Sequence, residues 1–115
     1  MTQPFKAIVR NQIHMAIIDL YGEINSFAEA GLNEAYTEAE KMNIPTIALN
    51  FSNVTYINST GIALIVGLLA RARKAHHPLA VFGLSEHYTE IFQITRLADF
   101  MSIYPDEESV LTGAV

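Results

Sequence analysis

One long stretch of the chain, residues 42–70, contains no Asp, Glu, Lys or Arg. Within it, residues 46–51 form a nearly continuous apolar run, which predicts a strand buried on both faces. Residues 61–70 are almost wholly apolar and precede basic residues at 71–74, a pattern typical of a helix with cations in its last turn. Asn, Pro and Ser interrupt the stretch too often for a transmembrane span, which needs roughly 20 apolar residues. We therefore expect a buried strand and an apolar helix at the centre of the fold, and no membrane insertion.

The composition narrows the class of protein. The chain has 115 residues, of which 50% are hydrophobic, so residues 1–115 can form a single domain with its own core. The formal net charge of −5 argues against nucleic acid or an anionic membrane as the main partner. Cysteine is absent, and residues 1–6 lack the apolar core of a signal peptide. Both observations fit a cytoplasmic protein.

Strand and helix patterns alternate along the rest of the chain. A hairpin turn is predicted at Asn11–Gln12, Ser26 and Glu29 have the spacing of a capping box, and Ser85 is a predicted helix cap. The predicted strands are residues 5–9, 13–20, 46–51, 79–83 and 101–104, and the predicted helices are residues 26–42, 61–74, 86–95 and from 105 onward. This order predicts an α/β fold with a mixed, mostly parallel sheet of four to five strands and about four helices.

Ser59 and Thr60 stand where the loop after the central strand becomes a helix near Gly61. A hydroxyl at this position can cap the free backbone N–H groups of the first helical turn. If the hydroxyl were phosphorylated, the same N–H groups and the positive end of the helix dipole would hold the phosphate. The residues alone leave both interpretations open.

The helix after Ser59 is predicted to be apolar on its outer face as well as on its core face. The residues predicted to pack on the sheet are Ile62, Ile65, Val66 and Leu69, and those on the opposite face are Leu64, Gly67, Leu68 and Arg71. Such an outer face is either covered by neighbouring elements or forms a partner-binding surface. We favour the partner, because the face would lie beside Ser59.

Ser59 also lies in a strand-to-helix turn of the kind that presents the nucleophile in many hydrolases. That motif requires Gly two residues before and after the Ser, and here Gly61 fits but Ile57 does not. None of the four histidines stands in a catalytic or metal-binding motif, and no phosphate-binding loop or dinucleotide fingerprint occurs. A Ser59-dependent hydrolase is therefore a distant alternative, and we expect no metal or cofactor.

Residues 49–62, which read Leu-Asn-Phe-Ser-Asn-Val-Thr-Tyr-Ile-Asn-Ser-Thr-Gly-Ile, closely resemble the signature of STAS domains of the anti-sigma factor antagonist type. Residues 20–25 resemble the loop before the first helix of this family, and residues 85–97 resemble its late helix. The resemblance covers essentially the whole chain. It implies the STAS fold and a binding protein without enzymatic activity.

In this family, an anti-sigma factor serine kinase of the histidine-kinase-like ATPase type phosphorylates the Ser of the central motif, and a metal-dependent serine phosphatase removes the phosphate. The unphosphorylated domain binds the kinase and releases a sigma factor, so the resemblance implies transcription regulation by partner switching. It implies phosphorylation at Ser59, with Thr60 as the second choice. With the apolar outer face, the expected partner-binding residues are Gly22, Glu23, Ile24, Asn25, Asn58, Thr60, Gly61, Ile62, Leu64 and Leu68.

The sequence departs from the family pattern where Asn25, Asn50 and Asn58 replace a usual Asp. A phosphate on Ser59 would meet less repulsion, but any role of these acids in kinase recognition would be lost. The departures favour an alternative, a STAS domain that does not switch and serves as a scaffold or as a subunit associated with a membrane-lipid transporter. Arg96 also stands where the family often has Gly in the last turn of its late helix.

Overall fold

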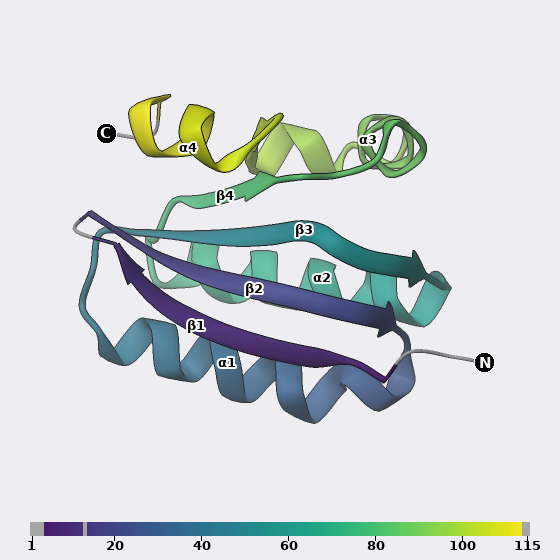
Figure 1. The fold of residues 1–115 in the computed structure, drawn as a ribbon, viewed down its shortest axis with the longest axis horizontal. Helices are drawn as coiled ribbons and strands as arrows, with labels where there is room; N and C mark the ends of the chain where they lie inside the picture. The colour runs from purple at the N-terminus through teal and green to yellow at the C-terminus, as the bar shows by residue number, and fades with distance from the viewer. Residues whose placement is uncertain (1–3, 13, 114–115) are drawn as a thin grey trace.

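The computed structural model describes residues 4–12 and 14–113. Its elements follow one another as predicted, with strands and helices alternating after a leading hairpin (Figure 1). In chain order they are β1 (Lys6–Gln12), β2 (Met15–Ile24), the short 3-10 helix η1 (Ser26–Ala28), α1 (Glu29–Lys41), β3 (Thr46–Ile57), α2 (Ser59–Lys74), β4 (Leu79–Phe82), α3 (Glu86–Ile94), the 3-10 helix η2 (Leu97–Phe100), β5 (Ser102–Tyr104) and α4 (Glu107–Gly113).

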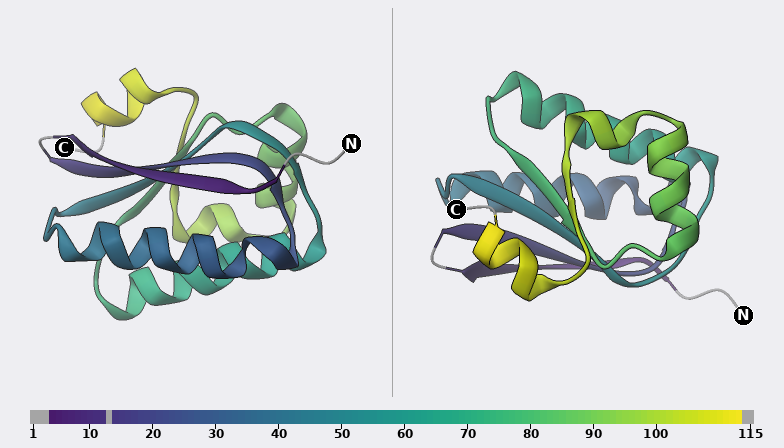
Figure 2. Two further views of the ribbon diagram at one scale, coloured as in Figure 1. Left: turned by 60° about the horizontal axis from the view of Figure 1, so that its bottom comes forward. Right: turned by 90° about the horizontal axis from the view of Figure 1, so that it is seen from above.

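The five strands form one sheet in the order β1-β2-β3-β4-β5. β1 pairs antiparallel with β2, and the remaining neighbours are parallel, which confirms the mixed, mostly parallel sheet. Each parallel connection passes through a helix, because parallel strands cannot be joined by a tight turn. Figures 1 and 2 show that α1 and α2 lie along one face of the sheet, whereas α4 lies on the other.

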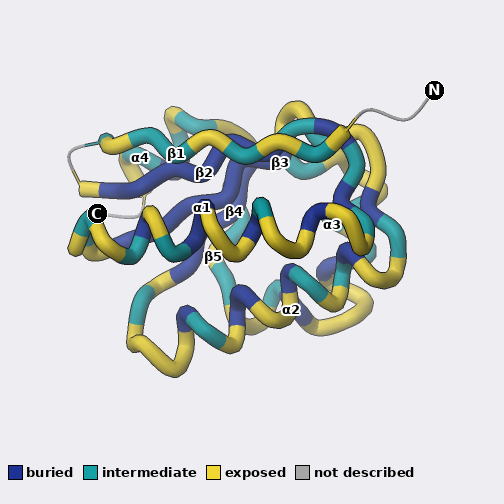
Figure 3. Tube along the Cα trace, turned by 90° about the horizontal axis from the view of Figure 1, so that it is seen from below, coloured by how far each residue is buried: buried dark blue, intermediate teal, exposed yellow. Residues whose placement is uncertain are grey.

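The core has two parts, one on each face of the sheet. The larger part packs β2 and β3 against α1 and α2, with Ile18, Leu49 and Ile65 fully buried. The smaller part lies under α4, where Val110 contacts the opposite face that carries Ile17. Side chains alternate between faces along a strand, so a strand covered on both sides must be apolar at every position, as Thr46–Phe51 nearly is. Figure 3 shows these buried central strands behind the largely exposed outer surfaces of α1 and α2.

The first hairpin differs from its prediction in register. Asn11 and Gln12 belong to β1 and pair with Ala16 and Met15, so they are strand residues and not the predicted turn. Ile13, where the second strand was predicted to begin, lies outside the described residues. β2 then continues to Ile24, four residues beyond the predicted end of this strand at residue 20, because residues 21–24 pair with the extended end of β3.

Three predicted helix starts have different outcomes. The capping box is wrong: Asn25, not Ser26, accepts a hydrogen bond from the Phe27 N–H (2.9 Å), and α1 begins only at Glu29. Ser85 is confirmed as the cap of α3, since its hydroxyl accepts from the Tyr88 N–H. The last helix begins as predicted after Pro105, where the Asp106 carboxylate accepts from the Ser109 N–H (2.8 Å).

Candidate functional site

Ser59 is the first residue of α2, and its side chain is exposed. The cap of this helix is Asn58, whose side-chain oxygen accepts a hydrogen bond from the Gly61 N–H (2.8 Å). The capping role that the sequence suggested for the hydroxyl of Ser59 or Thr60 therefore belongs to Asn58. Both hydroxyl residues are exposed at the positive end of the helix dipole, where a negative group is stabilised.

Two loops far apart in the sequence meet at this helix start. The Asn58 N–H donates to the Ile24 carbonyl oxygen over 3.2 Å. A Cβ atom at Gly61 would overlap the same carbonyl oxygen, so only Gly fits between the end of β2 and the start of α2. The structure thus brings together the two segments, residues 22–25 and 58–62, that the family resemblance assigned to one surface.

Asn25 organises the other loop, which carries an exposed aromatic residue. Its side-chain oxygen accepts from the Phe27 N–H, and its amide donates to Glu23 over 3.4 Å. In the resulting 3-10 turn, the Phe27 side chain is 91% exposed. The sequence did not indicate Phe27 as a surface residue, because a Phe near the start of a predicted amphipathic helix is normally part of the core.

The faces of α2 differ from the prediction by a rotation of the helix. The buried residues are Gly61, Ile65, Leu68, Leu69 and Ala72, so Leu68 was wrongly placed on the outer face. Val66 was wrongly placed in the core, since it is 43% exposed. The buried set follows i, i+4, i+7, i+8 and i+11 from Gly61, because the contact with Ile24 turns Gly61 inward.

The residues on the exposed side of α2 are nevertheless small and mostly apolar. We call it the α2 outer face, and it comprises Ser59, Ala63, Val66, Gly67 and Ala70. A Cβ atom at Gly67 would meet no other atom within 4 Å, so no contact within the described structure explains a Gly in the middle of this helix. The predicted apolar outer face exists, but of its four predicted residues only Gly67 belongs to it.

The predicted partner-binding residues divide into three groups by exposure. Thr60 is exposed, and five are half-buried: Glu23, Asn25, Asn58, Ile62 and Leu64. The remaining four, Gly22, Ile24, Gly61 and Leu68, are buried and cannot present a side chain to a partner. The buried members position the loops: Gly22 has a φ of 81° at a register shift of β2, where a left-handed backbone favours Gly.

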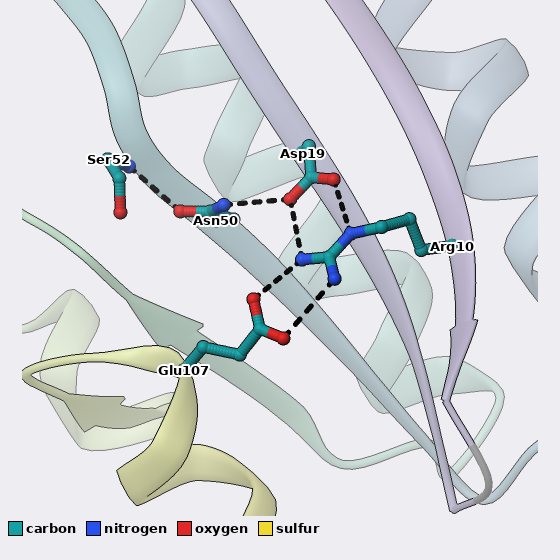
Figure 4. Close-up of polar contacts among 5 residues, drawn as sticks. All are labelled: Arg10, Asp19, Asn50, Ser52 and Glu107. Atoms are coloured by element: carbon teal, nitrogen blue, oxygen red, sulfur yellow. Dashed lines mark hydrogen bonds and ion pairs between the residues drawn. The ribbon is translucent and has the colours of Figure 1, made fainter.

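The third Asn that departs from the family pattern, Asn50, belongs to a different polar cluster (Figure 4). Its amide donates to Asp19 Oδ1 over 2.7 Å, and its side-chain oxygen accepts from the Ser52 N–H over 2.9 Å. Arg10 binds Asp19 and also Glu107 of α4, and these two carboxylates raise the pKa of its guanidinium, Glu107 more than Asp19. This cluster ties α4 to the β1–β2 hairpin.

Catalytic and membrane roles gain no support from the described residues. Residues 4–12 and 14–113 contain no group of three His, Cys, Asp or Glu side chains that could hold a metal ion. Over the same residues, the hydrogen bonds include none between Ser59 and a histidine, as a catalytic serine would require. No helix in the described part of the chain is long and apolar enough to cross a membrane.

Comparison with known proteins defines the family. The sequence model of the STAS domain matches residues 6–110. The chain is 32% identical over 82 residues to an anti-sigma-B factor antagonist of Staphylococcus aureus (strain NCTC 8325 / PS 47), covering 71% of this chain and 76% of that protein. The chain belongs to the STAS domain family, which agrees with a binding protein that is not an enzyme.

Solved structures share the fold. An anti-sigma factor antagonist from Mycobacterium paratuberculosis has a TM-score of 0.81 at 18% identity, with 97% of each chain covered. The Bacillus cell fate determinant SpoIIAA in its phosphorylated form has a TM-score of 0.69 at 20% identity, covering 95% of this chain and 98% of that one. These likenesses confirm the STAS-like α/β architecture.

Proposed function

We propose that this chain is an anti-sigma factor antagonist that acts by partner switching, with phosphorylation of Ser59 controlling its affinity for the partner. The partner is an anti-sigma factor serine kinase of the histidine-kinase-like ATPase type in the cytoplasm, and a metal-dependent serine phosphatase reverses the modification. The observation that carries the proposal is the exposed Ser59 at the first residue of α2, on an apolar outer face. The similarity to the S. aureus antagonist and to phosphorylated SpoIIAA supports it.

The geometry of the helix start suits a phosphorylation switch. A phosphate on Ser59 would lie at the positive end of the α2 dipole, where its charge is stabilised rather than opposed. Asn58 already caps the helix through Gly61, so the modification does not require the helix start to rearrange. We therefore expect the phosphate to change the surface and leave the fold intact.

The same phosphate would disturb binding. A partner seated on the α2 outer face would cover Ala63, Val66 and Gly67, none of which offers a counter-charge. A group with a charge of roughly −2 at the rim of this contact would have to be desolvated or displaced, which lowers the affinity. Dephosphorylation would restore the neutral surface.

The test combines mapping and binding. Phosphopeptide mapping of the protein from its own host, in growth and under stress, should find phosphate on Ser59 that changes between conditions. Ser59→Asp should weaken binding to the cognate kinase by about tenfold or more, and Ser59→Ala should bind as the wild type does. Asn33→Asp adds the same charge on the exposed side of α1 and serves as the control. If Ser59→Asp bound the cognate kinase as tightly as the wild type does, the proposal would be wrong.

The alternative is a non-switching STAS domain, acting as a scaffold or as a transporter-associated subunit. The observation that favours it is the absence of Asp at positions 25 and 58, on either side of the site. Against this, both Asn side chains accept the cap hydrogen bonds that an Asp would accept, so the local geometry is kept. Absence of phosphate from Ser59 and Thr60 in every condition would favour the scaffold.

A further inference from the structure

A groove of about 900 Å³ lies between α3 and β5, and none of its lining residues belongs to the Ser59 site. One wall is a stripe of α3 that includes Glu86, Glu90 and Gln93, and the other wall includes Ile103 of β5. Leu84 and Ala98 complete an apolar part of the lining. Figure 2 (right) shows α3 beside β5, with η2 joining them at one end.

The groove carries an uncompensated negative charge. Glu86 and Glu90 are both exposed and stand four residues apart on α3, a spacing at which like charges repel. No Lys, Arg or His lines the groove, and the ion pairs among the described residues include neither carboxylate. The chemistry that would complement this wall is therefore a cation supplied from outside.

The opposite wall is the edge of the sheet. β5 ends the strand order and pairs only with β4 within the described residues. An edge strand presents unpaired N–H and C=O groups that can pair with another extended chain. Residues 102–104 offer room for about three added residues, or about 10 Å of strand. Side chains of an added strand alternate in direction, so every second one would face the α3 wall.

We propose that this groove binds an extended, basic segment of a partner protein, which pairs with the free edge of β5 and places a Lys or Arg against Glu86 and Glu90. The aliphatic stems of those Lys or Arg side chains would contact Leu84 and Ile103, which line the same groove. The proposal does not depend on phosphorylation of Ser59, because no residue is shared between the two sites. It gives the domain a second docking surface that remains available while the α2 outer face is occupied.

The test titrates the full chain with the synthetic peptide acetyl-Val-Lys-Val-Lys-Val-amide and follows two-dimensional amide NMR. The expected result is a set of shift changes concentrated in residues 84–105, with slower hydrogen exchange at one or more amides of residues 102–104. The double variant Glu86→Gln/Glu90→Gln should bind about fivefold more weakly. If the double variant is destabilised, Glu90→Gln alone replaces it in the test. This single variant keeps the acidic start of α3, and it should lose part of the affinity for the peptide.

Two controls separate a specific groove from general attraction to an acidic protein. Glu34 and Glu38 form an equally spaced, exposed pair on α1, so Glu34→Gln/Glu38→Gln should bind the peptide as the wild type does. The peptide acetyl-Val-Glu-Val-Glu-Val-amide should not bind. The proposal is overturned by no shift change up to millimolar peptide, by changes centred on α1, or by equal binding of the acidic peptide.

Discussion

The side-chain amide of Asn50 donates a hydrogen bond to Asp19 Oδ1 over 2.7 Å, and both residues are buried. An amide can donate to a carboxylate, whereas an ionised Asp at position 50 could only accept. The departure from the family pattern at this position therefore has a structural reason in Asp19, on the face of the sheet that α4 covers. It concerns the attachment of α4 and not the environment of Ser59.

Asn50→Asp is expected to lower the free energy of unfolding by about 1–3 kcal/mol at neutral pH, because two buried carboxylates would face each other. The two like charges repel each other, so the loss should be smaller at acidic pH, where fewer carboxyl groups are ionised. Urea unfolding at pH 7 and at acidic pH measures this. Asn53→Asp, an exposed change on the same strand, is the control. A loss independent of pH would contradict the explanation.

Tyr36→Phe is expected to raise the free energy of unfolding by up to about 1 kcal/mol, because the buried Tyr36 hydroxyl has no hydrogen-bond partner among the described residues. The Arg71 guanidinium, 4.6 Å from the ring centroid, would stay over the ring. Tyr88→Phe is the control with the opposite expected sign. The Tyr88 hydroxyl accepts a hydrogen bond from the Ile57 N–H over 2.8 Å, so its removal should lower the free energy of unfolding. Destabilisation by Tyr36→Phe would contradict the argument.

The buried Tyr36 hydroxyl should also make the free energy of unfolding depend on pH in the alkaline range. Burial, and secondarily the Glu40 carboxylate, raises the pKa of the Tyr36 hydroxyl. The unfolded chain ionises this group near pH 10, before the folded protein does, so stability is lost as the pH rises from there through the folded pKa. Thermal unfolding between pH 8 and pH 11 should show a shallower alkaline loss for Tyr36→Phe than for the wild type.

Phe27→Ala is expected to weaken binding to the cognate kinase by about tenfold or more, because exposed aromatic residues often anchor interfaces. Stability should change little, since the side chain is 91% exposed. Ile94→Ala is the control, as Ile94 is 71% exposed on α3. Calorimetric titration with the kinase and thermal unfolding give the two readouts. Equal affinities of both variants would remove Phe27 from the partner surface.

The sequence predicted what depends on local patterns. The buried strand at Thr46–Phe51 and the Ser85 cap are confirmed, because an apolar run and a hydroxyl before a helix determine them locally. The extension of β2 to Ile24 was missed, because it depends on pairing with a distant part of β3. Arg96 has a φ of 68°, a left-handed backbone conformation in which Gly would be less strained than Arg.

Only part of the candidate site was predicted, because some of its features depend on contacts between distant segments of the chain. Ser59 and the meeting of the two loops followed from a family motif, but the rotation of α2 depends on the contact between Gly61 and Ile24. That contact buries Leu68 and exposes Val66, and periodicity alone could not choose this rotation. The cluster around Asn50 was not predictable, because its members come from separate strands and from α4.

The two glycines of α2 give a paired prediction. Gly61→Ala is expected to lower the free energy of unfolding by about 1–3 kcal/mol, because the new methyl group would overlap the Ile24 carbonyl oxygen. Gly67→Ala is expected to raise it by about 0.5–1 kcal/mol, since Ala favours the helix and the site is open. Urea unfolding measures both.

Binding to the kinase then separates the roles of the two positions. Gly67→Ala adds a methyl group to the α2 outer face, so a partner that packs closely there should bind it more weakly despite its greater stability. Unchanged affinity would mean that the contact does not extend along α2 as far as Gly67, and would confine the partner surface to the first two turns of the helix around Ser59.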